Sequence, residues 1–357
     1  MMDVPSDEEG DTTSVDLGFL EKSAPWRLKS EFFRSKVGGK PSWLNLSEIP
    51  TSDMVTCGHC QGPCIFLCQV YAPIEDQDSC FHRTLFIFMC PSAECCREND
   101  SASFKVLRCQ LSRRNQFYFY DAPIESEDFK PEVTAESFGK LCCVCNLKGV
   151  SHCGKCRVVN YCSRQHQVAD WKAGHKSECC SAGGTEYTLP LLLPEWELVT
   201  EPEPDVTAEP KQEKSNEEQL REFQELVQSG QAGSLHGDAA AEAELQSMPE
   251  GQDDATFKKF KQRVSRSPTQ VLRFEREGQT LWVSDLNQPE QMPPCSHCGS
   301  PRVFEFQVLP QMLNSLGLDT VGQSIDWGTL AVFTCQQSCS EGPAYKQEII
   351  VKQDFIK

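Results

Sequence analysis

Residues 57–70, CGHCQGPCIFLCQV, have a counterpart 238 positions later at residues 295–308, CSHCGSPRVFEFQV. Seven of the fourteen aligned positions are identical, including both cysteines of the Cys-x2-Cys motif. Downstream, each copy has a second apolar run that ends in cysteine, LFIFMCPSAEC at residues 85–95 and LAVFTCQQSC at residues 330–339. Such repeated order is typical of a duplicated structural unit. Because the apolar runs are short and β-type, we predict a mixed, β-rich fold with a duplicated β domain.

Between the two copies lies a block dense in cysteine and histidine, with the spacing Cys-x2-Cys-x7-Cys-x2-Cys-x5-Cys-x3-His-x8-His-x3-Cys. Its eight candidate ligands are Cys142, Cys145, Cys153, Cys156, Cys162, His166, His175 and Cys179. Zinc takes four tetrahedral nitrogen or sulfur ligands, so eight residues predict two ions. A block of about 40 residues cannot sustain a core unaided, and filled quartets leave no open catalytic position. We therefore predict two structural zinc ions here.

This block resembles a MYND zinc finger through its two Cys-x2-Cys pairs, Tyr161-Cys162-x3-His166, Trp171 and His175-x3-Cys179. The resemblance implies a small α-containing module with a cross-braced pair of sites. In that arrangement one ion takes Cys142, Cys145, Cys162 and His166, and the other takes Cys153, Cys156, His175 and Cys179. It also implies binding of short proline-containing peptides rather than DNA bases.

The flanking sequence resembles a narrower family, that of programmed cell death protein 2. The resemblance lies in residues 15–44, the unit at 57–95, and residues 304–339. It implies a duplicated β domain with an inserted MYND finger. It further implies handling of newly made ribosomal protein S2 during 40S assembly, while older descriptions of the family connect it with apoptosis, proliferation and DNA binding.

Each β repeat carries cysteines that can close a zinc-ribbon-like site. The candidate ligands are Cys57, Cys60, Cys90 and Cys95 in the first repeat, and Cys295, Cys298, Cys335 and Cys339 in the second. We predict one zinc ion in each, against the alternative of tight turns with buried thiols. Cys96 is an alternative to Cys95. The remaining thiols at Cys64, Cys68, Cys80 and Cys109 are predicted to fill the core.

The negative charge is concentrated in one segment. The chain has 357 residues and a formal charge of −18. Residues 194–256 contain 17 acidic and 3 basic residues, a net charge of −14, so the other 294 residues carry −4. We predict an acidic disordered tip at residues 1–13, an N-terminal β domain at 14–140, the finger at 141–181, an acidic linker at 182–252 and a C-terminal β domain at 253–357.

Short patterns refine this division. Residues 215–227 predict a short amphipathic helix within the linker, and a second helix is predicted to start at Asp253 or Asp254 and to end before Pro268. Gly38-Gly39-Lys40-Pro41 lacks the spacing of a phosphate loop and predicts a tight turn. The segment Pro190–Pro194 predicts either a ligand for the finger's own peptide groove or an apolar segment packed on a β domain.

The chain contains 21 cysteines and an acidic N-terminus without an apolar segment, so we expect no signal peptide. The longest apolar runs, such as Thr84–Met89, are too short to cross a bilayer, and no membrane association is expected. Reduced thiols are typical of cytoplasmic and nuclear proteins, so the cysteines predict metal sites and a cytoplasmic and nuclear location.

Three classes of function compete. The first is a non-enzymatic adaptor or chaperone for a basic ribosomal protein, because a polyanionic segment attracts cationic surface. The second is a DNA-binding nuclear regulator of apoptosis and proliferation that acts through the locally basic finger, although the overall charge disfavours phosphate. The third is an enzyme, for which no nucleophile or cofactor motif is present. We predict the adaptor, with no enzymatic activity.

Overall fold

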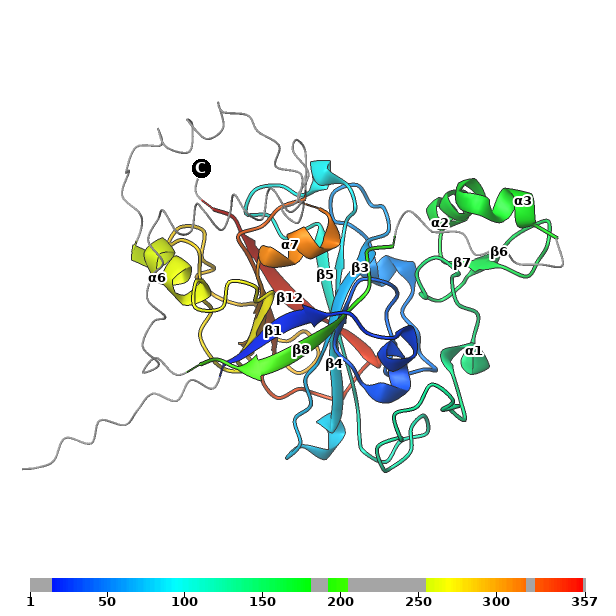
Figure 1. Cartoon of the computed structure of the whole chain (residues 1–357), viewed down its shortest axis with the longest axis horizontal. Helices are drawn as coiled ribbons and strands as arrows, with labels where there is room; N and C mark the ends of the chain where they lie inside the picture. Colours follow the sequence, from blue (N-terminus) through cyan, green and yellow to red (C-terminus); the bar gives the residue numbers. More distant parts are fainter. Residues whose placement is uncertain (1–14, 181–191, 205–254, 319–324, 356–357) are drawn as a thin grey trace, which may run out of the picture.

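The computed structural model describes residues 15–180, 192–204, 255–318 and 325–355 (Figure 1). The predicted acidic tip and the predicted helix at residues 215–227 lie outside these residues. The β-rich class is confirmed, because the architecture is dominated by one closed antiparallel barrel with a small finger attached to its side.

Ten strands form the barrel in the order β1-β8-β2-β3-β4-β5-β12-β11-β10-β9, and β9 pairs with β1 to close it. The strands are β1 (Asp16–Glu21), β2 (Lys36–Val37), β3 (Ile65–Tyr71), β4 (His82–Met89), β5 (Phe104–Leu111), β8 (Trp196–Pro202), β9 (Leu272–Phe274), β10 (Arg302–Val308), β11 (Thr329–Cys335) and β12 (Tyr345–Gln353). A closed barrel satisfies the backbone hydrogen bonds that an open sheet leaves at its edges.

The two sequence repeats form equivalent halves of this barrel. The first contributes β2 to β5 and the second contributes β9 to β12, and the last strands of the two halves, β5 and β12, pair with each other. Strands β3 and β10 each have a bulge beginning at the aligned residues Phe66 and Phe304. The duplication inferred from sequence is therefore visible in backbone detail.

The first strands are exchanged between the halves. Strand β1 precedes the first repeat but pairs with β9 of the second, with Gly18 opposite Leu272. Strand β8 precedes the second repeat but pairs with β2 of the first, with Glu197 opposite Lys36. The two strands also pair with each other along their length. Within the described residues, neither the part from 15 to 140 nor the part from 255 to 355 contains a closed sheet by itself, so the halves form one barrel rather than two independent sheets.

The prediction of an acidic linker over residues 182–252 is wrong in part, because strand β8 (Trp196–Pro202) lies within this range. The acidic composition concealed the strand. Glu197 is buried and lies 3.6 Å from the Arg34 guanidinium, while Glu195 pairs with Lys36 at 2.6 Å. Cationic partners from the first half thus allow an acidic segment to enter the sheet.

Residues 192–195 pack along the predicted tight turn at Gly38 and Gly39, whose φ angles are +72° and +64°. The Gly39 N–H donates to the Leu193 carbonyl at 2.9 Å. A Cβ atom on Gly38 would lie 1.9 Å from the Pro194 carbonyl oxygen, so the close approach requires glycine. Pro190 lies outside the described residues. The described part of this segment packs on the barrel.

The barrel interior holds the largest core cluster, to which alternate residues of the strands contribute. Leu85 and Ile87 of β4, Val106 of β5, Phe306 of β10 and Val332 of β11 are all fully or almost fully buried in it. A second cluster lies on the outer face of β4 and β5 and includes Phe86, Leu107 and the indole of Trp43. The finger packs on this second cluster.

Short helices cover the barrel and build the finger. The α-helices are α1 (Ala135–Phe138), α2 (Arg164–Asp170), α3 (Lys176–Glu178), α6 (Ala255–Val264) and α7 (Gln311–Leu316). The 3-10 turns are η1 (Pro25–Leu28), η2 (Ser30–Phe32), η3 (Ser52–Val55), η4 (Asp78–Cys80) and η5 (Ala93–Cys95), and η6 (Trp171–His175) is a π-helical turn. Helix α6 confirms the helix predicted after Asp253 and buries Phe260 and Val264 against Leu309.

The finger contains the two-stranded sheet of β6 (Ser151–His152) and β7 (Asn160–Tyr161) together with α2, η6 and α3 (Figure 1). It is attached to the barrel by specific contacts. The Trp43 Nε1–H donates to the Asn146 carbonyl at 2.7 Å, and the Lys148 N–H donates to the Pro50 carbonyl at 3.0 Å. Leu147 is fully buried in the outer core cluster. These contacts hold the first half of the finger firmly on the barrel.

Among the helices of the described residues, none is long and apolar enough to span a bilayer.

Candidate metal centres

The structure brings the sixteen predicted ligands together in four separate groups of four. In each group the ligand atoms all lie within 4.8 Å of one another. The groups are Cys57, Cys60, Cys90 and Cys95; Cys142, Cys145, Cys162 and His166; Cys153, Cys156, His175 and Cys179; and Cys295, Cys298, Cys335 and Cys339. The membership is the one predicted from sequence, and the two finger groups have the cross-braced pairing that the MYND resemblance implies.

The distances within the groups fit a tetrahedral zinc ion. With Zn–S bonds of about 2.3 Å, two sulfurs on one ion lie about 3.8 Å apart. The observed Sγ–Sγ distances are 3.7 Å for Cys60–Cys90, 3.8 Å for Cys153–Cys179 and 3.5 Å for Cys298–Cys335. These are far longer than a disulfide bond of about 2.05 Å. All cysteines are free thiols, and the clusters are compatible with zinc.

The first finger site joins a loop to the start of helix α2. Ser163 caps this helix and accepts a hydrogen bond from the His166 N–H at 3.2 Å. The cap orients the first turn so that His166 Nδ1 lies 3.1 Å from Cys162 Sγ and 3.7 Å from Cys142 Sγ. Because Cys162 and His166 are four residues apart, they share one face of the turn. His166 would bind a metal through Nδ1.

The second finger site lies at the end of the helical segment. His175 Nε2 lies 3.6 Å from Cys156 Sγ, and the Cys179 N–H donates to the His175 carbonyl at 2.7 Å. Between the two sites, the Tyr161 hydroxyl is fully buried and donates to Asp170 Oδ2 at 2.7 Å. This internal hydrogen bond links β7 to α2 and holds the two sites in fixed relation.

All four Cys-x2-Cys motifs adopt the same turn. The fourth residue after the first cysteine has a positive φ in each, at Gln61 (57°), Asn146 (59°), Arg157 (59°) and Gly299 (76°). Its N–H donates to the carbonyl of that first cysteine at distances between 2.8 and 3.1 Å. The left-handed residue is a feature that the sequence analysis missed, although asparagine and glycine at two of the positions are typical of it.

Backbone N–H groups in these turns also point at sulfur. In the first repeat, the His59 N–H donates to Cys57 Sγ and the Gly62 N–H to Cys60 Sγ, both at 3.4 Å. Hydrogen bonds between Cys298 and the side chain and backbone of Ser300 lower the pKa of Cys298 to about 6, and a hydrogen bond with the Cys156 backbone lowers the pKa of Cys153 to about 6. Such bonds favour the thiolate, which is the form that binds a metal.

The structure places Cys95 in the first-repeat cluster and Cys96 outside it. The Cys96 thiol instead donates to the Asp326 carbonyl at 3.2 Å. The four thiols predicted to fill the core are all buried, namely Cys64, Cys68, Cys80 and Cys109. Burial raises the pKa of Cys64 and of Cys109 to about 12, so both remain protonated and apolar. The buried core thiols are thus chemically distinct from the clustered cysteines.

Each cluster presents four ligands to one point, and this limits what a bound ion can do. A catalytic zinc ion keeps one position for water or substrate, whereas four protein ligands fill the tetrahedron. Ions in these four sites would stabilise the finger and the loops at the ends of β4 and β11. The arrangement supports a structural role.

Comparison with known proteins adds three domain matches. Residues 14–125 match the N-terminal domain of programmed cell death protein 2, residues 254–356 match the C-terminal domain of the same protein, and residues 142–179 match the MYND finger. No solved structure matches the chain significantly.

Curated relatives extend over almost the whole sequence. Programmed cell death protein 2 of Mus musculus is 40% identical, with 95% of this chain and 96% of the relative covered. Programmed cell death protein 2-like of Homo sapiens is 28% identical, with 85% of each chain covered. A shorter match, 32% identical over 24% of each chain, is to a protein of Schizosaccharomyces pombe named "Probable 20S rRNA accumulation protein 4". The chain belongs to the programmed cell death protein 2 family.

Proposed function

We propose that this protein is a zinc-stabilised, non-enzymatic adaptor or chaperone for a newly made basic ribosomal protein, ribosomal protein S2, during assembly of the 40S subunit. In this role it supports cell proliferation and survival. The observation that carries the proposal is the net charge of −14 on residues 194–256, attached to a scaffold of near-neutral charge.

The physical reason lies in the charge of the client. A ribosomal protein that has not reached the ribosome exposes a cationic surface that binds RNA unspecifically. A polyanionic segment competes for this surface and raises the rate of encounter, while the folded barrel offers specific contacts. The name of the Schizosaccharomyces pombe relative, which refers to 20S rRNA, supports a place in ribosome assembly.

The four-ligand clusters support binding rather than catalysis, because the ions they are suited to hold would be fully coordinated by protein. We further propose that the finger binds proline-containing peptide motifs of other partners. A cytoplasmic and nuclear location fits a protein that meets its client at translation and accompanies it to the site of assembly.

A capture experiment tests the proposed function. The full chain and a variant lacking residues 205–252 are expressed in translating cells, and co-purified proteins are identified. We expect the full chain to capture ribosomal protein S2, and the deletion to weaken capture and flatten its dependence on salt. If affinity and salt dependence both survive the deletion, the acidic segment is only a spacer. Tight DNA binding by the purified protein, without capture of the ribosomal protein, favours the alternative of a DNA-binding regulator.

A further inference from the structure

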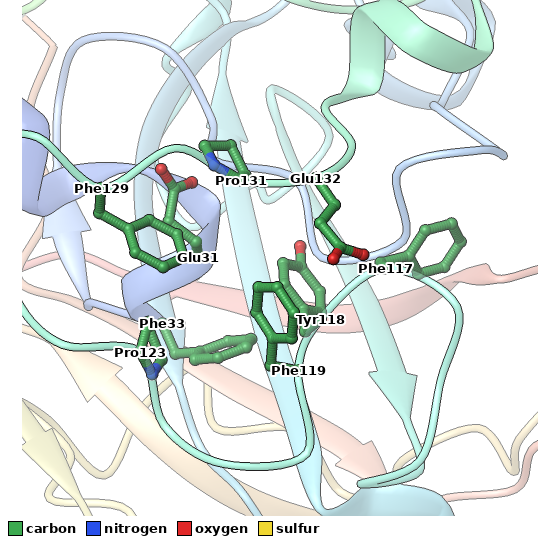
Figure 2. A pocket seen from close by; sticks show the side chains of 9 residues that line it. All are labelled: Glu31, Phe33, Phe117, Tyr118, Phe119, Pro123, Phe129, Pro131 and Glu132. Atoms are coloured by element: carbon green, nitrogen blue, oxygen red, sulfur yellow. The ribbon is translucent and has the colours of Figure 1, made fainter.

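A groove with acidic and aromatic walls lies where the first barrel half meets the start of the finger. A small pocket of about 20 Å³ is lined by Phe33, Phe119 and Phe129, among others (Figure 2). An adjoining pocket of about 360 Å³ extends from there toward Trp43 and Asn146. Glu31, Tyr118 and Pro131 line both pockets, so we treat them as one groove. None of these residues belongs to a metal cluster.

Glu31 is the unusual residue of this groove. The residue lies in η2 and only 8% of it is exposed, yet its Oε1 atom has no hydrogen-bond partner. Burying a carboxylate oxygen without a partner is costly, and a buried carboxylate in a folded protein normally has a cation beside it. Lys29 lines the larger pocket but is exposed, and within the described residues no ion pair joins it to Glu31. A cation from outside would satisfy this carboxylate.

Aromatic rings surround the same place. The rings of Phe33 and Tyr118 meet edge to face with centroids 4.8 Å apart, and Figure 2 shows Phe119 beside them and Phe129 close to Glu31. The Tyr118 hydroxyl donates to the Leu44 carbonyl at 2.8 Å, which holds its ring in place. Phe119 is 50% exposed, an unusual exposure for phenylalanine. Aromatic faces attract cations that approach within about 6 Å of the ring.

The loop that forms one wall of the groove is strongly acidic. Residues 121–136 contain six acidic residues and one lysine, a net charge of −5, and all six acidic residues are exposed. Glu125 is paired with Arg27 and Arg34, whereas Glu132 and Glu136 line the groove itself. In the sequence this loop is separate from the acidic segment at residues 205–252. It complements a positively charged ligand.

We propose that this groove binds an arginine side chain of a basic client protein, with the guanidinium between the Glu31 carboxylate and the aromatic rings. Arginine suits the site better than lysine, because its planar guanidinium stacks on rings, donates several hydrogen bonds and loses less hydration on burial. A purely apolar or proline-rich segment would leave Glu31 Oε1 without a partner. The inference deepens the proposed function by assigning the client a specific contact on the barrel.

Peptide binding to the full-length protein tests this assignment. The probes are a fluorescent Gly-Ser peptide containing arginine and its counterparts containing lysine or citrulline, compared by anisotropy at physiological salt. We expect the citrulline peptide to bind about tenfold more weakly, because the charge-assisted hydrogen bonds to Glu31 are lost. We expect the lysine peptide to bind more weakly than the arginine peptide. Equal binding of the arginine and citrulline peptides overturns the proposal.

Two variants place the binding in the groove. Glu31→Gln keeps the shape of the side chain and is expected to weaken arginine-peptide binding about tenfold. Phe119→Ala, at a half-exposed position, is expected to weaken it about threefold. The matched controls Glu277→Gln and Leu286→Ala, which change exposed residues that line neither pocket, are expected to leave affinity unchanged. Unchanged affinity in both groove variants, with melting temperatures equal to wild type, overturns the proposal.

The same variants separate this inference from the proposed function. If Glu31→Gln captures ribosomal protein S2 as well as the wild type does, while deletion of residues 205–252 reduces capture, the groove assignment fails and the chaperone function stands. If no ribosomal protein is captured by any form, the proposed function fails, whatever the arginine peptide does.

Discussion

Arg83 and Glu305 form a fully buried ion pair inside the barrel. The Nη1–Oε1 and Nη2–Oε2 distances are 2.6 and 2.8 Å, and neither side chain is accessible to solvent. The Thr334 hydroxyl donates to Glu305 Oε2 at 2.5 Å, and the Arg276 guanidinium lies 3.0 Å from the same oxygen. Since Arg83 lies on β4 and Glu305 on β10, this network joins the two halves of the barrel.

Removing one member should lower the free energy of unfolding by much more than the net contribution of the intact pair. We predict that Arg83→Met lowers the free energy of unfolding by about 3–5 kcal/mol, because it leaves Glu305 buried with weaker compensation. Urea unfolding measures the change. Asp121→Asn, which removes an exposed partner of Arg113, should change stability by less than about 0.5 kcal/mol. Equal effects of the two substitutions would contradict the buried pair.

The Glu305 carboxylate should also make the free energy of unfolding depend on pH. Burial alone would raise the pKa of Glu305, but the Arg83 and Arg276 guanidiniums together hold this pKa below its usual value. The folded-state pKa therefore lies below the unfolded-state value of about 4.3, and the stabilisation is complete above that value. As the pH falls through the folded-state pKa, the stabilisation is lost. Unfolding free energy should fall more steeply below about pH 4.5 in the wild type than in Glu305→Gln. Parallel curves would show that Glu305 contributes nothing to the slope.

Cys335 tests the difference between a metal ligand and a filler thiol. It is fully buried and belongs to the second-repeat cluster, whereas Cys80 is equally buried but lies outside every cluster. We predict that Cys335→Ser removes one zinc ion per chain and lowers the melting temperature strongly, because metal binding contributes directly to folding free energy. In Cys80→Ser the hydroxyl can still donate to the Ser338 carbonyl that now accepts from the thiol, so the effect should be modest. An unchanged melting temperature and zinc content in Cys335→Ser would exclude it as a ligand.

At the scale of elements, the exchange of β1 and β8 makes the two halves interdependent. Strand β1 lies between β8 and β9 of the second half, strand β8 lies between β1 and β2 of the first half, and a further connection is the pairing of β5 with β12. The hydrogen bonds between the halves therefore run along two separate seams of the barrel. Such an arrangement differs from two domains joined only by a flexible connection.

This exchange predicts the outcome of cutting the chain. A protease site inserted between residues 205 and 254 would separate the covalent chain into a part with β1 to β8 and a part with β9 to β12. We predict that the two parts stay associated in native buffer, because both seams remain paired. Size-exclusion chromatography after cleavage measures this, and addition of urea should release the parts. Spontaneous separation without denaturant would contradict the closed barrel.

At the scale of the whole molecule, four clusters of candidate metal ligands are distributed over three regions. Two lie in the finger, one lies near the end of β4 and one near the end of β11. We predict four zinc ions per chain by elemental analysis of purified protein. The double variant Cys295→Ser/Cys298→Ser should contain three. A value of two for the wild type would restrict metal to the finger.

The distribution of negative charge is also a property of the whole molecule. The strongly acidic residues 205–254 connect β8 to α6, while the exposed acidic loop at residues 121–136 lies beside the finger. In the function that we propose, a basic client would meet negative charge from a chain segment and from a folded surface together. Long-range attraction of this kind governs the rate of encounter, and the proposed binding of arginine in the groove at Glu31 would determine specificity.

Local spacing in the sequence was sufficient to predict the clusters of candidate metal ligands and the duplication. The Cys-x2-Cys turns and the i,i+4 ligand pairs depend on a few neighbouring residues, and the repeated order at residues 57–95 and 295–339 needs only alignment. Helix α6 followed from its start signal, its apolar spacing and Pro268. Contacts between residues far apart in the sequence could not be predicted from local patterns. The choice between Cys95 and Cys96 was open for a similar reason, because adjacent residues on one loop differ only in where their side chains point.

The sequence by itself therefore determined the β-rich class, the repeat, the finger and the sets of four ligands, because each is encoded in short-range pattern and residue chemistry. Only the tertiary structure decided that both repeats close one barrel, that β8 is a strand despite its acidic residues, and that Glu31 is buried among aromatic rings. Strand exchange and groove formation depend on which distant segments meet. Residues such as Glu197 and Glu31 have the same local chemistry as any exposed glutamate until a partner from another part of the chain surrounds them.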